Sequence, residues 1–355
     1  MKGCSGWPNH PGVHYHRLIL DRVVQETPDA RSFVLAVPAD LKERFAYRAG
    51  QFLTFRVPWE GDSLIRCYSL ASCPVSEAGE WKVTVKRVES GRISNWFHDE
   101  LSPGDELEVM APSGRFVLRG SEAPLLLFAG GSGITPVISL VKSALATTTR
   151  RIRLVYANRD RGSVIFAAEL EALSSVQGDR LQVIHHLDDT QGFLDVSAAA
   201  AHGRGFEGAD AYVCGPTPFM DVVERALASG GFAADRTFIE RFESPENDAS
   251  LERLLGADEV EGEVPAEILV HLEGEEHRVP YAAGQSILRA AIDAGLDVPF
   301  ACREGYCGSC AARTVQGDLV MAHNEVFNKA EVAKGWVLTC QARPTGRTCE
   351  VRYDD

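Results

Sequence analysis

Four cysteines near the end of the chain constrain it more than any other feature. Cys302, Cys307 and Cys310 lie on one glycine-containing loop, and Cys340 follows after twenty-nine intervening residues. This C-x4-C-x2-C…C spacing is that of the thiolate ligands of a 2Fe-2S cluster. Glycines would let the loop bend so that its N–H groups point at the sulfur atoms, which stabilises the reduced cluster. The spacing therefore predicts an iron–sulfur centre.

A structural zinc site and ordinary buried thiols are the two alternatives for these cysteines. Zinc sites usually pair two short C-x2–4-C motifs, whereas here three thiols lie within nine residues and the fourth is alone. The spacing favours the cluster. The remaining cysteines show no grouping and by default are small apolar core residues: Cys4, Cys67, Cys73, Cys214 and Cys349.

Length and charge set broader limits. A chain of 355 residues, 45% of them apolar, is typical of a soluble globular protein with two or three domains. No stretch approaches the roughly 20 apolar residues of a membrane span, and the tail over residues 1–16 has no apolar signal segment. With reduced cluster cysteines, this predicts a cytoplasmic protein. A net charge of −14 argues against nucleic acid or an anionic membrane as partner.

Residues 17–120 predict a small antiparallel β-barrel, with short runs of strand character separated by Pro and Gly turns. Within it, Arg66-Cys67-Tyr68-Ser69 combines side chains that suit a flavin nucleotide. A guanidinium can hold phosphate, a phenol ring can lie against the isoalloxazine, and a hydroxyl can hydrogen-bond its reactive nitrogen. An ordinary strand is the alternative interpretation of this tetrapeptide.

The turn Gly91-Arg92-Ile93-Ser94 precedes a predicted helix over residues 95–101, with Ser94 as its expected N-cap. Free N–H groups at a helix N-terminus would suit a pyrophosphate, although a plain capped helix accounts for the pattern equally well. A second phosphate-binding turn beside the flavin motif favours FAD over FMN.

Residues 121–242 alternate between predicted strands and helices, which indicates a doubly wound α/β domain with a parallel sheet. Such sheets bind ligands at the carboxyl ends of their strands. After the first strand, the turn Gly130-Gly131-Ser132-Gly133-Ile134-Thr135-Pro136 would let a dinucleotide approach the backbone, although it is not the G-x-G-x-x-G motif. At a later strand end, Cys214-Gly215-Pro216 would place a thiol beside a nicotinamide, or would be only a tight turn.

The segment over residues 243–264 predicts an acidic linker. Residues 243–263 hold eight acidic residues against the single Arg253. A flexible chain of this length would span about 25 Å, enough for a swinging domain, although a passive spacer accounts for it equally well. Residues 265–355 then match an α+β ferredoxin domain of the β-grasp type, with a helix predicted over residues 286–294.

Taken together and in this order, the motifs resemble the ferredoxin–NADP reductase superfamily with a fused plant-type 2Fe-2S ferredoxin. The likeness covers residues 15–355. Within the superfamily, the chain is similar to reductase components of oxygenase systems, including those of 3-ketosteroid 9α-hydroxylase and phenylacetyl-CoA epoxidase. The resemblance implies FAD, a nicotinamide coenzyme and a 2Fe-2S cluster held by the four spaced cysteines.

The resemblance also implies roles for individual residues. Arg66 would hold a FAD phosphate, Tyr68 would stack on the flavin and Ser69 would lie at its N5 atom. Thr135 would touch both flavin and nicotinamide, and Glu240 would place a carboxylate beside the flavin. The other residues assigned to FAD or to the coenzyme are Lys86, Gly91, Arg92, Ser94, Gly130, Gly131, Gly133, Pro136, Asn158, Arg159, Gly215, Pro216 and Phe242, and Cys214 is counted with the catalytic group.

NADH is the expected coenzyme, with NADPH as the alternative. Selection of NADPH needs cations for its 2′-phosphate, whereas Asn158-Arg159-Asp160-Arg161 mixes charges of both signs. By resemblance, the nearest relatives favour NADH.

The expected activity is a conversion of two-electron into one-electron transfer: hydride from NADH to FAD, then single electrons through the cluster to a protein acceptor. No acid–base triad is required. A terminal oxygenase of the Rieske type is the expected acceptor, and a di-iron hydroxylase, epoxidase or desaturase is the alternative. A redox-sensing flavin and iron–sulfur module without turnover is the alternative from another class.

Overall fold

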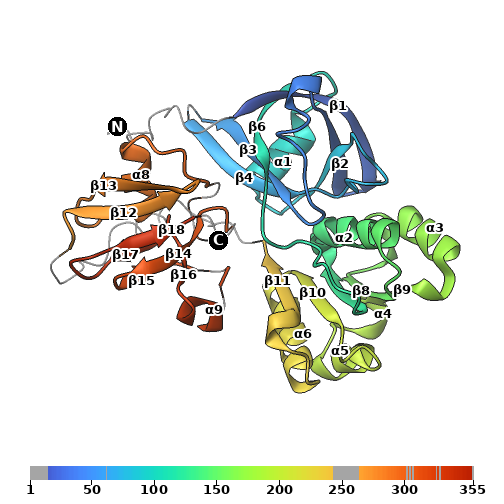
Figure 1. Ribbon diagram of the computed structural model, residues 1–355. Coiled ribbons are helices and arrows are strands. Elements are labelled where there is room, and N and C mark those ends of the chain that lie inside the picture. Colours follow the sequence, from blue (N-terminus) through green and yellow to red (C-terminus); the bar gives the residue numbers. More distant parts are fainter. Residues whose placement is uncertain are drawn as a thin grey trace. The chain divides into compact units, whose positions relative to one another are not determined.

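The computed structural model describes residues 15–60, 62–242, 264–300, 303, 305, 308–324, 326–327 and 329–353. The predicted linker, apart from residue 264, and almost all of the predicted tail lie outside these ranges. The described residues form two compact units (Figure 1): residues 16–57 and 68–242 make up one, and residues 58–67 belong with the C-terminal segment in the other.

An antiparallel sheet in the order β4-β3-β6-β1-β2-β5 forms the N-terminal domain, with helix α1 packed against it. Phe97 of α1 contacts Phe33 and Phe55 edge-on, with ring centroids 5.2 and 5.3 Å apart, and all three are fully buried. Side chains that point inward from the strands thus pack against helix α1. The elements are β1 His16–Thr27, β2 Ala30–Ala36, β3 Phe52–Trp59, β4 Asp62–Ser69, β5 Trp81–Lys86, α1 Arg92–Asp99 and β6 Glu106–Ser113.

The predicted start of α1 is wrong. The helix begins at Arg92 with Gly91 as its N-cap, and no side chain caps it. The Ser94 hydroxyl instead accepts a hydrogen bond from the backbone N–H of Val88, at 3.2 Å. Ser94 therefore lies inside the helix and stabilises the turn before it, which a sequence signal for capping does not distinguish.

A five-stranded sheet in the order β11-β10-β7-β8-β9 forms the second domain, and its described strand pairs are all parallel. Alternate residues of β7 enter separate cores: Leu125 and Leu127 pack on the side of α2, whereas Leu126 and Phe128 pack on the side of α6. Burial on both faces explains the continuous apolar run. The strands are β7 Leu125–Gly130, β8 Ile152–Asn158, β9 Leu181–Leu187, β10 Asp210–Gly215 and β11 Thr237–Arg241.

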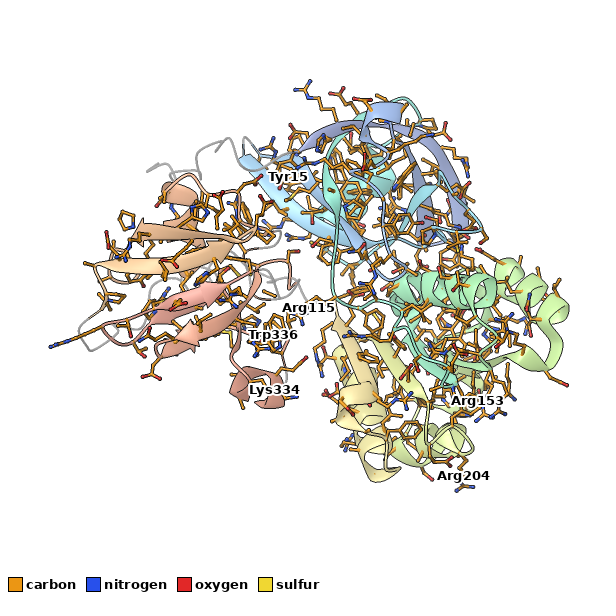
Figure 2. All side chains as sticks on the ribbon, viewed as in Figure 1. Tyr15, Arg115, Arg153, Arg204, Lys334 and Trp336 are labelled. Carbon is orange, nitrogen blue, oxygen red and sulfur yellow. The ribbon has the colours of Figure 1, made fainter. Side chains whose placement is uncertain are left out.

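Helices cover both faces of this parallel sheet (Figure 1). Near the amino end of β8, Arg153 donates a hydrogen bond of 2.9 Å to the carbonyl oxygen of Arg204, the residue that follows α5. This bond ties the end of α5 to the sheet, and Figure 2 labels both arginines. The helices are α2 Ile134–Thr147, α3 Ala167–Gln177, α4 Asp188–Gln191, α5 Val196–Gly203 and α6 Thr217–Ser229. None of the helices in the described part of the chain is long and apolar enough to cross a membrane.

The C-terminal domain contains a mixed sheet in the order β13-β12-β18-β14-β16 and a small sheet of β15 and β17. Helix α8 packs on it, and its N-cap is Ser286, whose hydroxyl accepts from the N–H of Arg289. The strands over residues 267–280 form a hairpin, because the chain reverses at Glu273 and Gly274, both at positive φ. The elements are β12 Glu267–Leu272, β13 Glu275–Pro280, α8 Ile287–Asp293, β14 Ala311–Gln316, β15 Leu319–Met321, α9 Lys329–Ala333, β16 Trp336–Leu338, β17 Ala342–Pro344 and β18 Glu350–Arg352.

Candidate functional site

Ser69 ends strand β4 with a buried hydroxyl. Its side-chain oxygen has no hydrogen-bond partner among the residues that the structure describes, and the residue is 3% exposed. Leaving a buried polar group unsatisfied costs about 1–3 kcal/mol. A ligand atom that hydrogen-bonds this hydroxyl would remove that cost, so the residue fits the nitrogen atom of a flavin.

Tyr68 is held by two aromatic rings while remaining half-buried. Its ring centroid lies 5.0 Å from that of Phe97 and 5.9 Å from that of Phe55. Contacts with these two buried rings limit how the phenol can turn. A fixed and partly accessible ring is what a stacked flavin requires. Arg66, on the same strand, donates a hydrogen bond of 2.7 Å to the carbonyl oxygen of Ile65.

Gly91 and Arg92 lie at the N-terminus of α1, where the amide of Asn95 donates to the carbonyl oxygen of Gly91 at 2.6 Å. A Cβ atom on Gly91 would lie 2.5 Å from the Ser94 hydroxyl oxygen. The turn is therefore compact, and only a residue without a side chain fits its first position.

The two predicted nucleotide turns meet at the carboxyl edge of the parallel sheet. A Cβ atom on Gly133 would lie 2.2 Å from the carbonyl oxygen of Cys214, and one on Gly130 would lie 2.9 Å from Pro216 Cδ. A Cβ atom on Gly215 would lie 3.0 Å from Gly130 Cα, so this glycine also contacts the first turn. Two segments far apart in the sequence thus form one surface, and the glycines allow their backbones to touch.

Thr135 and Pro136 lie in the first turn of helix α2, which begins at Ile134. The Thr135 side chain is buried and its hydroxyl donates to the carbonyl oxygen of Ser132 at 3.0 Å. Sequence reasoning missed Tyr156, a fully buried residue of β8 whose hydroxyl donates to the carbonyl oxygen of Gly131 at 3.0 Å. The signal was a phenol within the apolar run Leu154–Ala157 of this strand, since a buried hydroxyl needs a partner.

Cys214 and Glu240 are register partners on the adjacent strands β10 and β11. Complete burial raises the pKa of the Cys214 thiol well above its ordinary value, and the Glu240 charge acts in the same direction. Burial therefore favours the neutral thiol over the thiolate at this position. Composition alone makes Glu240 an exposed charge, but it is partly buried and its Oε2 atom is covered. Phe242, two residues on, is 44% exposed.

A cluster of charged side chains lies where the first two domains meet within the larger unit. Asp29, from the turn between β1 and β2, pairs with Arg159 at 3.0 Å and with Lys86 at 3.7 Å. Burial opposes ionisation of Asp29, but the hydrogen bond from Thr27 and these two cations outweigh it and lower its pKa. Lys86 Nζ also lies 3.9 Å from the Cβ position of Gly131, so Lys86 approaches the coenzyme turn.

Asn158 ends strand β8 as a buried residue, whereas the side chain of the next residue, Arg159, is 67% exposed. The exposed guanidinium is therefore not built into the domain core. Asp29 was not identified from the sequence, because its two cationic partners are distant in the chain.

Two of the four cysteines that the spacing predicts as cluster ligands are described by the structure. Cys310 and Cys340 are buried and are joined through Thr339, which donates to the carbonyl oxygen of Cys310 from its N–H at 3.1 Å and from its hydroxyl at 2.9 Å. Tyr353 donates in turn to the Thr339 hydroxyl at 2.8 Å. Cys302 and Cys307 lie outside the described residues. These hydrogen bonds fix the positions of the two buried thiols, which therefore fit the sulfur ligands of a cluster.

Three protein-family models match the chain in succession. They are the oxidoreductase FAD-binding domain over residues 17–118, the oxidoreductase NAD-binding domain over residues 127–225 and the 2Fe-2S iron–sulfur cluster binding domain over residues 270–345. The chain is 41% identical over 348 residues to the ferredoxin reductase component of 3-ketosteroid-9-alpha-monooxygenase from Mycolicibacterium smegmatis, covering 97% of this chain and 98% of the relative. The chain belongs to the family of oxygenase reductases.

A second relative and one solved structure support the same conclusion. One subunit of the 1,2-phenylacetyl-CoA epoxidase of Escherichia coli is 31% identical over 358 residues, which cover 96% of this chain and 98% of the relative. The crystal structure of phthalate dioxygenase reductase is similar with a TM-score of 0.59 at 27% identity, covering 95% of this chain and 98% of that chain. The predicted three-part fold, FAD, the nicotinamide coenzyme and the 2Fe-2S cluster are confirmed for this reductase.

Proposed function

We propose that this reductase takes hydride from NADH and delivers single electrons to the terminal oxygenase of a steroid 9α-hydroxylase-type system. The observation that supports the flavin step best is the buried Ser69 hydroxyl at the end of β4. It has no hydrogen-bond partner among the described residues, and a bound flavin would supply one. Bound FAD supplies the hydride-accepting chemistry, and the protein binds and orients its ring.

The residues divide into three groups under this proposal. Arg66, Lys86, Gly91, Arg92 and Ser94 bind the FAD phosphates and ring, while Tyr68 and Ser69 orient its reactive face. The nicotinamide would lie beside Thr135 and Cys214, with the Glu240 carboxylate beside the flavin. The turns Gly130–Pro136 and Cys214–Pro216 would hold the coenzyme together with Asn158, Arg159 and Phe242. Cys302, Cys307, Cys310 and Cys340 hold the cluster. The buried Cys214 thiol takes no covalent part in the proposed reaction.

The chain divides accordingly at residues 17–120, 121–242 and 265–355, with the acidic residues 243–264 as the tether of the ferredoxin domain. We place the protein in the cytoplasm, because its cluster thiols need a reducing compartment.

The steroid system is favoured over a di-iron epoxidase because the 3-ketosteroid-9-alpha-monooxygenase reductase shares 41% identity with this chain, against 31% for the relative from the epoxidase. Reconstitution with each purified oxygenase tests this choice. Faster NADH-dependent product formation with the epoxidase oxygenase than with the ketosteroid oxygenase would contradict it.

NADH is expected to support at least tenfold higher kcat/KM than NADPH, because the Asp29 carboxylate 3.0 Å from Arg159 disfavours a second anion such as the 2′-phosphate beside that guanidinium. Steady-state reduction of ferricyanide with each coenzyme measures the ratio. Equal or higher efficiency with NADPH would refute the preference. If neither coenzyme supported reduction, the result would favour the alternative function of a redox-sensing module without turnover.

Gly133→Ala is expected to slow NADH-dependent flavin reduction at least tenfold. The added methyl would lie 2.2 Å from the carbonyl oxygen of Cys214, so the two nucleotide turns must separate. Stopped-flow loss of flavin absorbance measures the rate. Gly120→Ala is the matched control, since its Cβ position has no heavy atom of a described residue within 4 Å apart from the adjoining chain. Equal rates in both variants would show that contact between the turns is not needed.

A further inference from the structure

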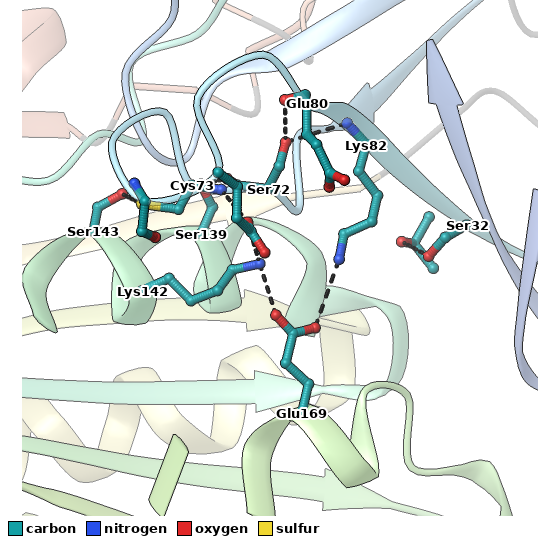
Figure 3. Close-up of polar contacts among 12 residues, drawn as sticks. Ser32, Ser72, Cys73, Glu80, Lys82, Ser139, Lys142, Ser143 and Glu169 are labelled. Carbon is teal, nitrogen blue, oxygen red and sulfur yellow. Dashed lines mark hydrogen bonds and ion pairs between the residues drawn. The ribbon is translucent and has the colours of Figure 1, made fainter. Parts of the chain in front are cut away.

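Helix α2 carries a polar face in an otherwise apolar and buried sequence. Thr135, Ser139 and Ser143 repeat at four-residue spacing, which places them on one side of the helix, and Lys142 lies beside Ser143. Thr135 belongs to the coenzyme turn. One and two helical turns later, the same side meets the FAD-binding domain at residues 72–82 (Figure 3), a segment that begins three residues after Ser69.

Three contacts join the helix to this segment, and each uses a different residue of the polar face. They are Ser139 Oγ to the carbonyl oxygen of Ser72 at 2.6 Å, Ser143 Oγ to Cys73 Sγ at 3.3 Å, and Lys142 Nζ to Glu77 Oε2 at 2.7 Å. Glu77 Oε2 also accepts from the N–H of Cys73 at 2.6 Å, so the carboxylate that binds Lys142 is itself fixed.

Lys142 is the centre of this network. Its side chain is 5% exposed, and Nζ lies 2.8 Å from Glu169 Oε1 on helix α3 as well as against Glu77. Lys82, from strand β5, pairs with the other oxygen of Glu169 at 3.6 Å. Two lysines and two glutamates thus alternate across the boundary between the FAD-binding and NAD-binding domains, and their formal charges cancel.

Such a network contributes more to geometry than to net stability. The free energy needed to desolvate buried charges is about as large as the free energy gained from their attraction. Apolar side chains of the same volume would therefore stabilise the boundary equally well. Apolar surfaces, however, tolerate small sliding movements. A buried ammonium between two carboxylates permits only one arrangement of the three elements, because a displaced charge would be left unpaired.

We propose that Lys142 is a positioning residue, which sets the distance between the coenzyme turn and the flavin motif. The inference rests on the proposed hydride transfer. Lys142 acts through α2, whose N-terminus holds Thr135, and through the 72–77 segment, whose preceding strand holds Ser69. An error of about 1 Å between reacting groups can cost about 100-fold in rate, so fixing this boundary controls the reaction without contact to either ligand.

Lys142→Met, which keeps the length of the side chain and removes its charge, tests the proposal. We expect the rate of flavin reduction at saturating NADH to fall at least tenfold, while the dissociation constant for NADH changes less than threefold. The long-wavelength charge-transfer absorption of the stacked nicotinamide and flavin should weaken. Hydrogen exchange of the variant should rise in residues 72–80. Lys142→Arg, which restores the charge, should recover part of the rate.

Arg180→Met is the matched control. Arg180 donates to the carbonyl oxygens of Ala144 and Leu145 at 3.0 and 3.1 Å, so it ties the other end of α2 within the NAD-binding domain alone. This variant should leave the saturating rate and the charge-transfer absorption unchanged.

A saturating rate in Lys142→Met within twofold of wild type would overturn the proposal. If that variant does not fold, Glu77→Gln replaces it, since the amide keeps the size of the carboxylate, and an unchanged rate there would overturn the proposal equally. Failure of NADH to reduce the wild-type flavin would instead contradict the proposed function, so the two failures are distinguishable.

Discussion

Cys310→Ser is expected to abolish the 2Fe-2S cluster while NADH reduces FAD at nearly the wild-type rate. The cluster requires soft thiolate ligands, and a serine hydroxyl is a poor substitute for a thiolate. Cys310 and Cys340 belong to the C-terminal compact unit, whereas Tyr68, Ser69 and the coenzyme turn belong to the other. Loss of the cluster therefore leaves the residues of the hydride step in place.

Two electron acceptors allow flavin reduction and electron transfer through the cluster to be measured separately. Ferricyanide can take electrons from reduced flavin, so its reduction should persist, while reduction of cytochrome c should fall at least tenfold if it proceeds through the cluster. The visible absorption and the electron paramagnetic resonance signal of the reduced protein report the cluster directly.

Cys349→Ser is the control for this variant. Cys349 is buried in the same core but lies outside the spaced ligand set, and burial raises the pKa of its thiol to about 12. It should therefore behave as an apolar core residue, and its replacement should keep the cluster. Loss of both cluster and flavin reduction in Cys310→Ser would show that the two units do not function independently.

Asp210→Ala is expected to destabilise the NAD-binding domain by about 3–5 kcal/mol, which is the cost of breaking a buried ion pair. Asp210 is 3% exposed at the start of β10 and accepts from two arginines. Arg150, whose side chain is fully buried, binds one carboxylate oxygen, and Arg236 binds the other at 2.8 and 2.9 Å. Removing the carboxylate leaves Arg150 buried without a counter-charge.

Hydrogen exchange of peptides from β7 and β10 under increasing urea measures this loss, because it reports the opening of one domain in a chain with several. Asp179→Ala is the control, since Asp179 is exposed, and it should change the opening free energy by less than about 0.5 kcal/mol. An equally small change in Asp210→Ala would mean that water or a rearranged side chain compensates Arg150.

The sequence by itself determined the features that depend on short-range pattern. Burial on both faces of β7 requires a continuous apolar run, and the meeting of Gly133 with Cys214 requires a residue without a side chain. Each constraint restricts the residue types allowed within one short segment, so residue type and spacing reveal it even where the contact itself joins distant segments. The three-domain order, the nucleotide turns and the spaced cysteines were therefore predictable.

Only the tertiary structure decided which polar groups became partners. Ser94 satisfies the N–H of Val88 rather than capping its helix, and Glu240 is partly buried because β11 pairs beside Cys214. Lys142 is the clearest case, since its carboxylate partners lie 65 and 27 residues away in the chain. A charged side chain can pair with any opposite charge that folding brings within reach, so its partner depends on the packing of whole domains rather than on local pattern.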